Sequence, residues 1–237
     1  LLGPGPLEPH LVHGLGFAQA FSAAGAAQPS FDDAPRDSTP AGSSAPASVL
    51  DLGSGGGLPG LVLAVFWRHT TLTLLDAQHR SAAFLSEAAD RLGLSERVVV
   101  LEGRAEELGR RPEWRGGFDV VVARSFARPA VTAECAAPFL RPAGVLVVSE
   151  PPAATGRAAA PTPGAGHWAT DRESAGGKVL TPEVGAERWP AAGLALLGMD
   201  PALAVPGELH FVVVRQHSAC PERFPRRVGV PAKRPLF

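Results

Sequence analysis

Short apolar runs alternate with helix-forming stretches from residue 48 to residue 149. The apolar runs predict buried strands at 48–52, 71–76, 97–102, 118–123 and 144–149. Apolar residues at helical spacing between them predict helices at 58–67, 79–92, 104–110 and 129–140. Strict alternation of strand and helix favours a doubly wound α/β fold with a parallel sheet and right-handed crossovers.

The pattern changes near the C-terminus. It predicts a helix near 182–197, a strand around 200–204 and a strong strand at Leu209–Arg215. Two closing strands after a final helix suit a seven-stranded sheet whose last strand is antiparallel. In the helix at 79–92, we expect the core-facing residues to be Ala83, Phe84, Ala88 and Leu92.

Two stretches rich in Pro and Ala lack an apolar period. They predict a linker at 28–47 and a flexible insertion at about 151–177. We therefore expect a divergent helical segment at 1–27, then the linker, one α/β domain at 48–217 and a basic tail at 218–237. A chain of 237 residues is long enough for one such core.

Composition narrows the possible classes. No apolar run approaches the roughly 18 residues that span a bilayer, so we expect no membrane segment. The two cysteines, Cys135 and Cys220, lie far apart, which argues against a disulfide framework and a zinc site, and we expect no metal. A reducing cytoplasm fits best, and we expect a monomer.

The net charge of −1 hides a basic C-terminus. The basic side chains of residues 221–237 are Arg223, Arg226, Arg227, Lys233 and Arg234. Glu222 is the single acid among them. Such a tail suggests a polyanionic partner, because Arg and Lys bind phosphate and release counterions. A solvated terminus without a partner is the alternative.

The most informative stretch is 49–60, where an apolar strand and Asp51 precede five glycines and Pro59. Glycine allows positive φ and close approach of the backbone, so the stretch predicts a strand, loop and helix that cradle a nucleoside-bearing cofactor. The spacing of Gly55, Gly57 and Gly60 also satisfies the GxGxxG pattern of a dinucleotide-binding turn.

Two residues favour S-adenosylmethionine over a dinucleotide. Asp51 adds a negative charge near the helix start where a pyrophosphate would sit, and Pro59 removes an N–H donor there. S-adenosylmethionine has no phosphate and carries an ammonium, a sulfonium and a carboxylate, which suits this mixture better. A dinucleotide and a purely structural glycine loop stay open as alternatives.

Other candidate contacts follow the carboxyl ends of the predicted strands, where ligands of doubly wound sheets bind. Asp76 can accept hydrogen bonds from ribose hydroxyls. After the third strand, a backbone N–H near Ala105 and the acid Glu106 could hold the adenine edge, or Glu106 caps a helix. Arg124 contacts a cofactor carboxylate or a substrate phosphate, or forms an ion pair with Asp51 or Glu106.

Several of these motifs resemble a known family, the small-subunit rRNA guanine-N7 methyltransferases formerly called glucose-inhibited division protein B. The matching stretches are 51–60, 74–85, 103–107, 123–127 and 224–236. The resemblance implies a Rossmann-like class I methyltransferase fold over 48–217 and S-adenosylmethionine as cofactor. It implies cofactor contacts at Gly53, Leu58, Ala105, Glu106 and Arg124. Gly55, Gly57 and Asp76 complete the candidate set.

The resemblance also implies a substrate, small-subunit rRNA or the assembling small subunit. The candidate RNA contacts are Arg128 and the five cations of the tail. Phe126 either stacks on the target base or belongs to the core. Guanine N7 has a lone pair and no proton, so methylation requires no general base. Arg124 is then a candidate for positioning.

The chain departs from the family pattern at two places. Family members usually carry Lys-Gly after the fifth strand, where this chain has Ser149-Glu150-Pro151-Pro152, so a cation that would face substrate is missing. Near the N-terminus, only His10 and Leu15 match the usual His-x-x-Asp-Ser-Leu stretch. The competing hypotheses are a small-molecule methyltransferase and a noncatalytic rRNA-binding protein.

Two further groups have ordinary structural explanations. Cytosine-C5 methylation needs a nucleophilic Cys near the site, but we expect Cys135 and Cys220 to be inert. His10 and His13 are three residues apart but have no further ligands nearby in sequence, so we expect them on a helix surface or in the core rather than on a metal.

Overall fold

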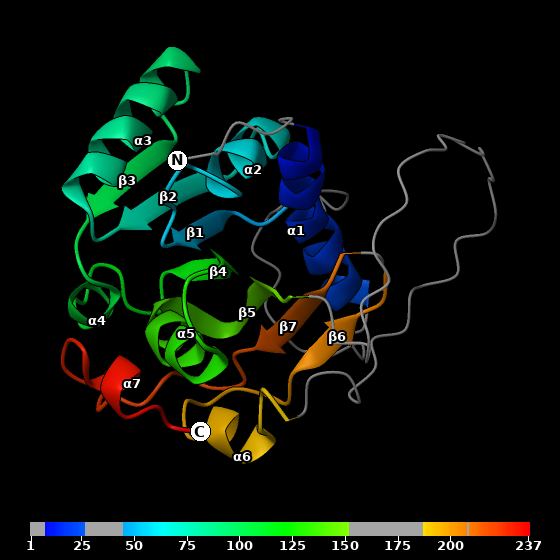
Figure 1. Ribbon diagram of the computed structural model, residues 1–237, viewed down its shortest axis with the longest axis vertical. Helices are drawn as coiled ribbons and strands as arrows, with labels where there is room; N and C mark the ends of the chain where they lie inside the picture. The colour runs from blue at the N-terminus through cyan, green and yellow to red at the C-terminus, as the bar shows by residue number, and fades with distance from the viewer. Residues whose placement is uncertain (1–7, 27–44, 152–186, 208) are drawn as a thin grey trace, which may run out of the picture.

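The computed structural model describes residues 8–26, 45–151, 187–207 and 209–237 (Figure 1). Seven strands form a single sheet within these residues. The strands are β1 Ser48–Leu52, β2 Thr71–Asp76, β3 Val98–Glu102, β4 Phe118–Arg124, β5 Leu140–Ser149, β6 Leu203–Val205 and β7 Phe211–Arg215. Their order across the sheet is β3-β2-β1-β4-β5-β7-β6.

The sheet is parallel from β3 through β5 and antiparallel at β7, which pairs with β5 on one side and β6 on the other. The predicted doubly wound sheet with an antiparallel last strand is therefore confirmed. Because β1 to β5 run in one direction, their carboxyl ends meet at one edge. The loops that follow Asp51, Asp76, Glu102 and Arg124 lie there together.

Helices cover both faces of the sheet, which explains why the central strands are continuous apolar runs rather than alternating ones (Figure 1). On one face, α1 Glu8–Ala26, α2 Gly60–Phe66 and α3 His79–Arg91 share a core that includes Phe17, Leu63 and Leu85. The helices of the opposite face are α4 Ala105–Leu108, α5 Pro129–Ala136 and α6 Ala191–Ala195, with the 3₁₀ turn η1 Ala137–Phe139. Phe17, Leu63 and Leu85 on the first face are fully buried.

The helices lie where predicted but are mostly shorter. The predicted helix at 129–140 is divided, because the chain tightens into η1 before β5 begins at Leu140. Of the helix predicted at 182–197, the described residues contain α6. The strand expected around 200–204 is β6, and β7 begins at Phe211 rather than at Leu209.

The predicted core face of α3 is wrong. Ala82, Leu85 and Ala89 are buried, whereas Phe84 is 40% exposed and Leu92 is 53% exposed. Both apolar sets fit helical spacing, so the pattern alone cannot choose between them. In the structure, Phe84 instead lines a cavity beside Gly55.

The C-terminal segment packs against the domain. The Arg115 guanidinium donates hydrogen bonds of 2.7–3.0 Å to the backbone carbonyls of Gly109, Cys220, Pro221 and Phe224. A last short helix, α7 Val230–Lys233, follows (Figure 1). Residues 218–237 thus share the core of the sheet's second face through side chains such as Phe224.

The other predicted segments fall mainly outside the described residues. This holds for 28–44 of the expected linker and for 152–177 of the expected insertion. The expected N-terminal helical segment contains α1, which packs against α2, β5 and β7. Among the described helices, none is long and apolar enough to cross a membrane.

Candidate cofactor site

The glycine loop folds back over the carboxyl ends of β1 and β2. The backbone N–H groups of Gly53 and Ser54 both donate to the Leu75 carbonyl, at 2.8 and 3.0 Å. The Asp51 carboxylate lies beneath the loop, only 1% exposed, and its Oδ2 accepts the Gly60 N–H at 2.9 Å. A Cβ on Gly60 would lie 2.6 Å from that same oxygen, so only glycine permits this approach.

Asp51 therefore fixes the loop instead of facing a ligand. Burial raises the pKa of its carboxyl to about 7, although the Gly60 N–H opposes the shift. The carboxylate also occupies the start of α2, where a dinucleotide would place its pyrophosphate. This arrangement supports the choice against a dinucleotide that the sequence suggested.

Asp76, unlike Asp51, lines the site. It is 8% exposed, and its two oxygens accept the backbone N–H groups of Gly55 and Gln78, each at 2.8 Å. Each carboxylate oxygen has a second lone pair. Asp76 can therefore hold the loop and still accept hydrogen bonds from a ligand.

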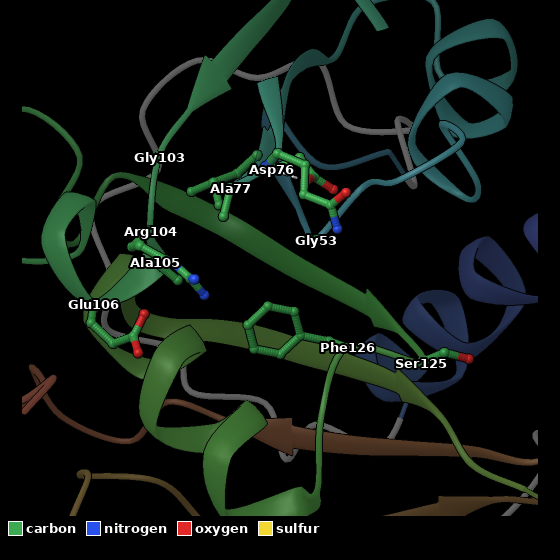
Figure 2. Close-up of a pocket in the computed structure, with 11 residues that line it drawn as sticks. Gly53, Asp76, Ala77, Gly103, Arg104, Ala105, Glu106, Ser125 and Phe126 are labelled. Atoms are coloured by element: carbon green, nitrogen blue, oxygen red, sulfur yellow. Dashed lines mark hydrogen bonds between the residues drawn. The ribbon is translucent and has the colours of Figure 1, made fainter. Parts of the chain in front are cut away.

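A cavity of about 350 Å³ opens beside Asp76 (Figure 2). Its lining residues are Gly53, Leu75, Asp76, Ala77, Gln78, Gly103, Arg104, Ala105, Glu106, Ser125 and Phe126. They come from the loops after β1, β2, β3 and β4, as the sheet topology requires. Gly53 has φ +75°, and a Cβ there would lie 2.6 Å from the Phe126 ring.

Phe126 is therefore partly a core residue. Its half-buried ring packs against the core of the second face and covers Gly53, yet it also lines the cavity. Of the two interpretations of Phe126, the packing one is realised, and contact with a ligand in the cavity stays a prediction.

A second cavity of about 230 Å³ adjoins the first and shares Gly53 and Ser125 with it. Its other lining residues are Ser54, Gly55, Gly56, Leu58 and Arg124. Ser125 has φ +53°, a backbone conformation rare for a residue with a side chain, which recurs at ligand sites. Asp76 thus lines the first cavity and Arg124 lines the second, and we treat the two as one site.

Arg124 has an unused donor in this site. Its Nη2 lies 3.2 Å from Nδ1 of His10, while its Nη1 is buried and has no hydrogen-bond partner among the described residues. Of the alternatives for Arg124, an ion pair with Asp51 or Glu106 is not formed in the described part of the chain. A buried guanidinium N–H without a partner fits a carboxylate of a ligand.

The turn after β3 supplies the opposite wall of the first cavity. Ala105, 4% exposed, begins α4, and the Glu106 side chain lines the cavity. Glu106 Oε1 also accepts the Gly229 N–H at 3.0 Å, so this acid links the cavity to the C-terminal segment. The structure thus places Gly53, Asp76, Ala105 and Glu106 together.

All the candidate cofactor residues lie at the two cavities or in the loop beside them. Leu58 and Gly55 line the second cavity, while Gly57 lies within the loop and donates its N–H to the Ser54 carbonyl at 2.8 Å. Gly57 lines neither cavity, so its contribution is to the shape of the loop.

The candidate RNA contacts divide into two groups. Arg128 and the tail cations Arg223, Arg227, Lys233 and Arg234 are exposed. Arg226 instead forms a bidentate ion pair with Glu134, at 2.6 and 2.8 Å. Glu134 is fully buried, so Arg226 holds the C-terminal segment to α5 and is not free for a phosphate.

Glu150, which departs from the family pattern, points into the protein. One oxygen lies 2.7 Å from Arg188 Nε, and the other accepts the Trp189 indole N–H at 3.0 Å. Arg188 thus sets a half-exposed cation beside the position where the family usually has lysine. The added negative charge is balanced within the structure.

The comparisons with known proteins agree with this geometry. Residues 39–150 match the model of a family described as rRNA small subunit methyltransferase G. A ribosomal RNA small subunit methyltransferase G from Prochlorococcus marinus (strain MIT 9313) is 35% identical over 191 residues, covering 81% of this chain and 68% of the relative. The chain belongs to this methyltransferase family. A Deinococcus radiodurans member is 37% identical, over 80% of this chain and 66% of its own length.

Family membership settles the fold and the cofactor. The sheet is the Rossmann-like sheet of class I methyltransferases, and the family uses S-adenosylmethionine, as predicted. The solved structure of a geranyl diphosphate methyltransferase in complex with SAM matches 43% of this chain and 40% of its own at 19% identity, with a TM-score of 0.37. A match with so low a TM-score supports no conclusion about this chain.

The site fits S-adenosylmethionine. Gly53 lines the first cavity with its backbone, Asp76 offers acceptors for ribose hydroxyls, and Arg124 Nη1 is a donor without a partner among the described residues. Within the described ranges, no group of three or more His, Cys, Asp or Glu side chains could hold a metal ion. Burial raises the pKa of the Cys220 thiol to about 11 and also raises that of Cys135, which leaves both as unreactive thiols.

Four contributors were not predicted from the sequence, namely Ala77, Gln78, His10 and Arg115. Ala77 and Gln78 line the cavity and directly follow Asp76, so their position at a strand end was an available signal. The contact between His10 and Arg124 joins residues 114 positions apart, and no local pattern indicates it. Arg115 likewise acts through contacts distant in sequence.

Proposed function

We propose that this chain transfers the methyl group of S-adenosylmethionine to N7 of a guanine in small-subunit ribosomal RNA, as a monomer in the cytoplasm. The relatives named above are ribosomal RNA small subunit methyltransferases, and the tail motif that suggested RNA belongs to the folded part of this chain. The observation that carries the cofactor half is the presence of Asp76 at the first cavity and, at the adjoining second cavity, of Arg124, whose Nη1 has no hydrogen-bond partner in the described part of the chain.

Each residue has a role that its position supports. Asp76 accepts hydrogen bonds from the ribose, and the backbone at Ala105 with Glu106 borders the adenine. The glycine loop surrounds the middle of the site, and Arg124 Nη1 donates to the carboxylate. When bound, the cofactor supplies an electrophilic methyl group.

The chain then has little proton chemistry to perform. Guanine N7 attacks with its in-plane lone pair and carries no proton, so no base is required. The tasks of the residues are to align the two reactants, exclude water and hold an unpaired base at the mouth of the site. Ser125 lines both cavities and Phe126 lines the first, so both are placed to border that mouth.

The exposed cations are proposed to contact the RNA backbone. Arg227, Lys233 and Arg234 are exposed on the segment that Glu106 and Glu134 hold against the domain. Each phosphate contact on single-stranded RNA contributes about 0.7 to the slope of log affinity against log salt. Replacing all three with Gln should lower the slope by about 2, whereas an unchanged slope would remove this segment from the RNA surface.

The central experiment is methyl transfer. Labelled S-adenosylmethionine is incubated with the chain and either small-subunit rRNA or isolated small subunits, and the modified base is mapped. Label at guanine N7 is the expected result. Binding of rRNA without transfer would favour a noncatalytic rRNA-binding protein. Transfer to small molecules alone would favour a small-molecule methyltransferase.

A further inference from the structure

The N-terminal helix reaches the cofactor site through one side chain. His10 lies in the first turn of α1, and its Nδ1 is 3.2 Å from Nη2 of Arg124 at the end of β4. A guanidinium has no acceptor, so the imidazole nitrogen must accept. His10 is therefore neutral in this contact and carries its hydrogen on Nε2.

Close packing fixes the position of α1. A Cβ on Gly14 would lie 3.2 Å from the Val62 side chain, and one on Gly16 would lie 2.7 Å from the Phe211 ring. The rings of His13 and Phe17 both pack against Phe211 of β7, with centroids 5.3 and 4.7 Å apart. The helix is thus seated on α2 and β7, and His10 is held over Arg124.

The contact with His10 restricts the orientation of the Arg124 guanidinium. Because the group is planar and rigid, a hydrogen bond at Nη2 also fixes the direction of Nη1. Nη1 is the buried donor without a partner, and Arg124 lines the second cavity with Gly55 and Leu58. His10 therefore determines where the unused donor points.

We propose that His10 is a positioning residue for cofactor binding, which orients Arg124 toward the carboxylate of the methionine part of S-adenosylmethionine. The inference rests on the proposed placement of that carboxylate at Arg124. It gives α1 a function in the site besides covering the sheet.

The test compares two ligands that differ in the relevant group. S-adenosylhomocysteine carries the carboxylate, whereas 5′-methylthioadenosine lacks the whole amino acid part. Calorimetric titration of His10→Ala should show about tenfold weaker binding of S-adenosylhomocysteine and unchanged binding of 5′-methylthioadenosine. His10→Asn, which keeps an acceptor near the Nδ1 position, should restore most of the loss.

Two controls separate orientation from general loosening of α1. His13→Ala removes a ring that packs on Phe211 and leaves the His10 contact in place, so it should not discriminate between the ligands. In an Arg124→Ala background, His10→Ala should have no further effect, because the two changes remove one interaction.

The outcomes are distinct. Equal weakening of both ligands by His10→Ala, or no weakening of either, would overturn the inference while leaving the cofactor site intact. Failure of the unmodified chain to bind S-adenosylhomocysteine would contradict the proposed function and this inference with it.

Discussion

The glycine loop at 53–60 and the C-terminal segment at 218–237 are held in place by the same device and used differently. In each, a buried carboxylate binds a neighbouring segment, Asp51 through the Gly60 N–H and Glu134 through Arg226. The loop lines a cavity with its backbone, whereas the segment leaves cations facing solvent. A sequence motif thus contains some residues that fix the backbone and others that remain available to bind a partner. Residues of the two kinds can be neighbours in the sequence.

The largest effect should come from separating Arg226 and Arg227, which are neighbours of the same type. Arg226→Met leaves the buried Glu134 without its partner, and loss of one member of a buried pair costs about 3–5 kcal/mol. Arg227→Met removes an exposed charge and should change the unfolding free energy by less than about 0.5 kcal/mol. Urea unfolding of both variants measures the difference; equal stabilities would mean that Arg226 is not a structural residue.

The next test concerns Asp51 and pH. Its pKa is raised to about 7 in the folded chain, so folding favours the protonated acid. The unfolded chain releases that proton near pH 4, and the folded chain keeps it until about pH 7. Asp51 should therefore reduce stability as pH rises from 4 to 7, by up to about 4 kcal/mol, with no further change above.

Asp51→Asn removes the titration and keeps an oxygen for the Gly60 N–H. The difference in unfolding free energy between wild type and variant, measured by urea at pH 5, 6, 7 and 8, should shift in favour of the variant up to pH 7 and then stay constant. Parallel pH profiles would show that Asp51 does not titrate in this range.

A smaller effect is expected from two glycines of the loop. Gly60→Ala would force a Cβ against the Asp51 carboxylate and should cost about 1–3 kcal/mol. Gly56 has no neighbour within 4 Å of an added Cβ and no positive φ, so Gly56→Ala should be nearly neutral. Thermal unfolding of both variants tests this, and similar losses would mean that the loop depends on flexibility rather than on close approach.

Sequence reasoning succeeded where the determining interactions are local. The strands, the glycine loop and the acids at strand ends follow from patterns a few residues long, and the sheet order fits them. It failed for the buried face of α3, where Ala82 and Ala83 are equally compatible with helical spacing. It also could not separate Arg226 from Arg227, because their difference depends on Glu134, 92 residues away.

The contacts of Arg115 indicate that the folded domain extends past residue 217. One side chain donates to four carbonyls, three of them within 220–224. A chain cut at 217 would remove those three acceptors and would leave Glu134 without the Arg226 guanidinium. Residues 218–237 therefore belong to the same cooperative unit as the sheet, and their hydrogen-bonded amides should exchange with solvent through global unfolding rather than local fraying. The segment that the sequence suggests is an appended basic tail is therefore a structural part of the domain.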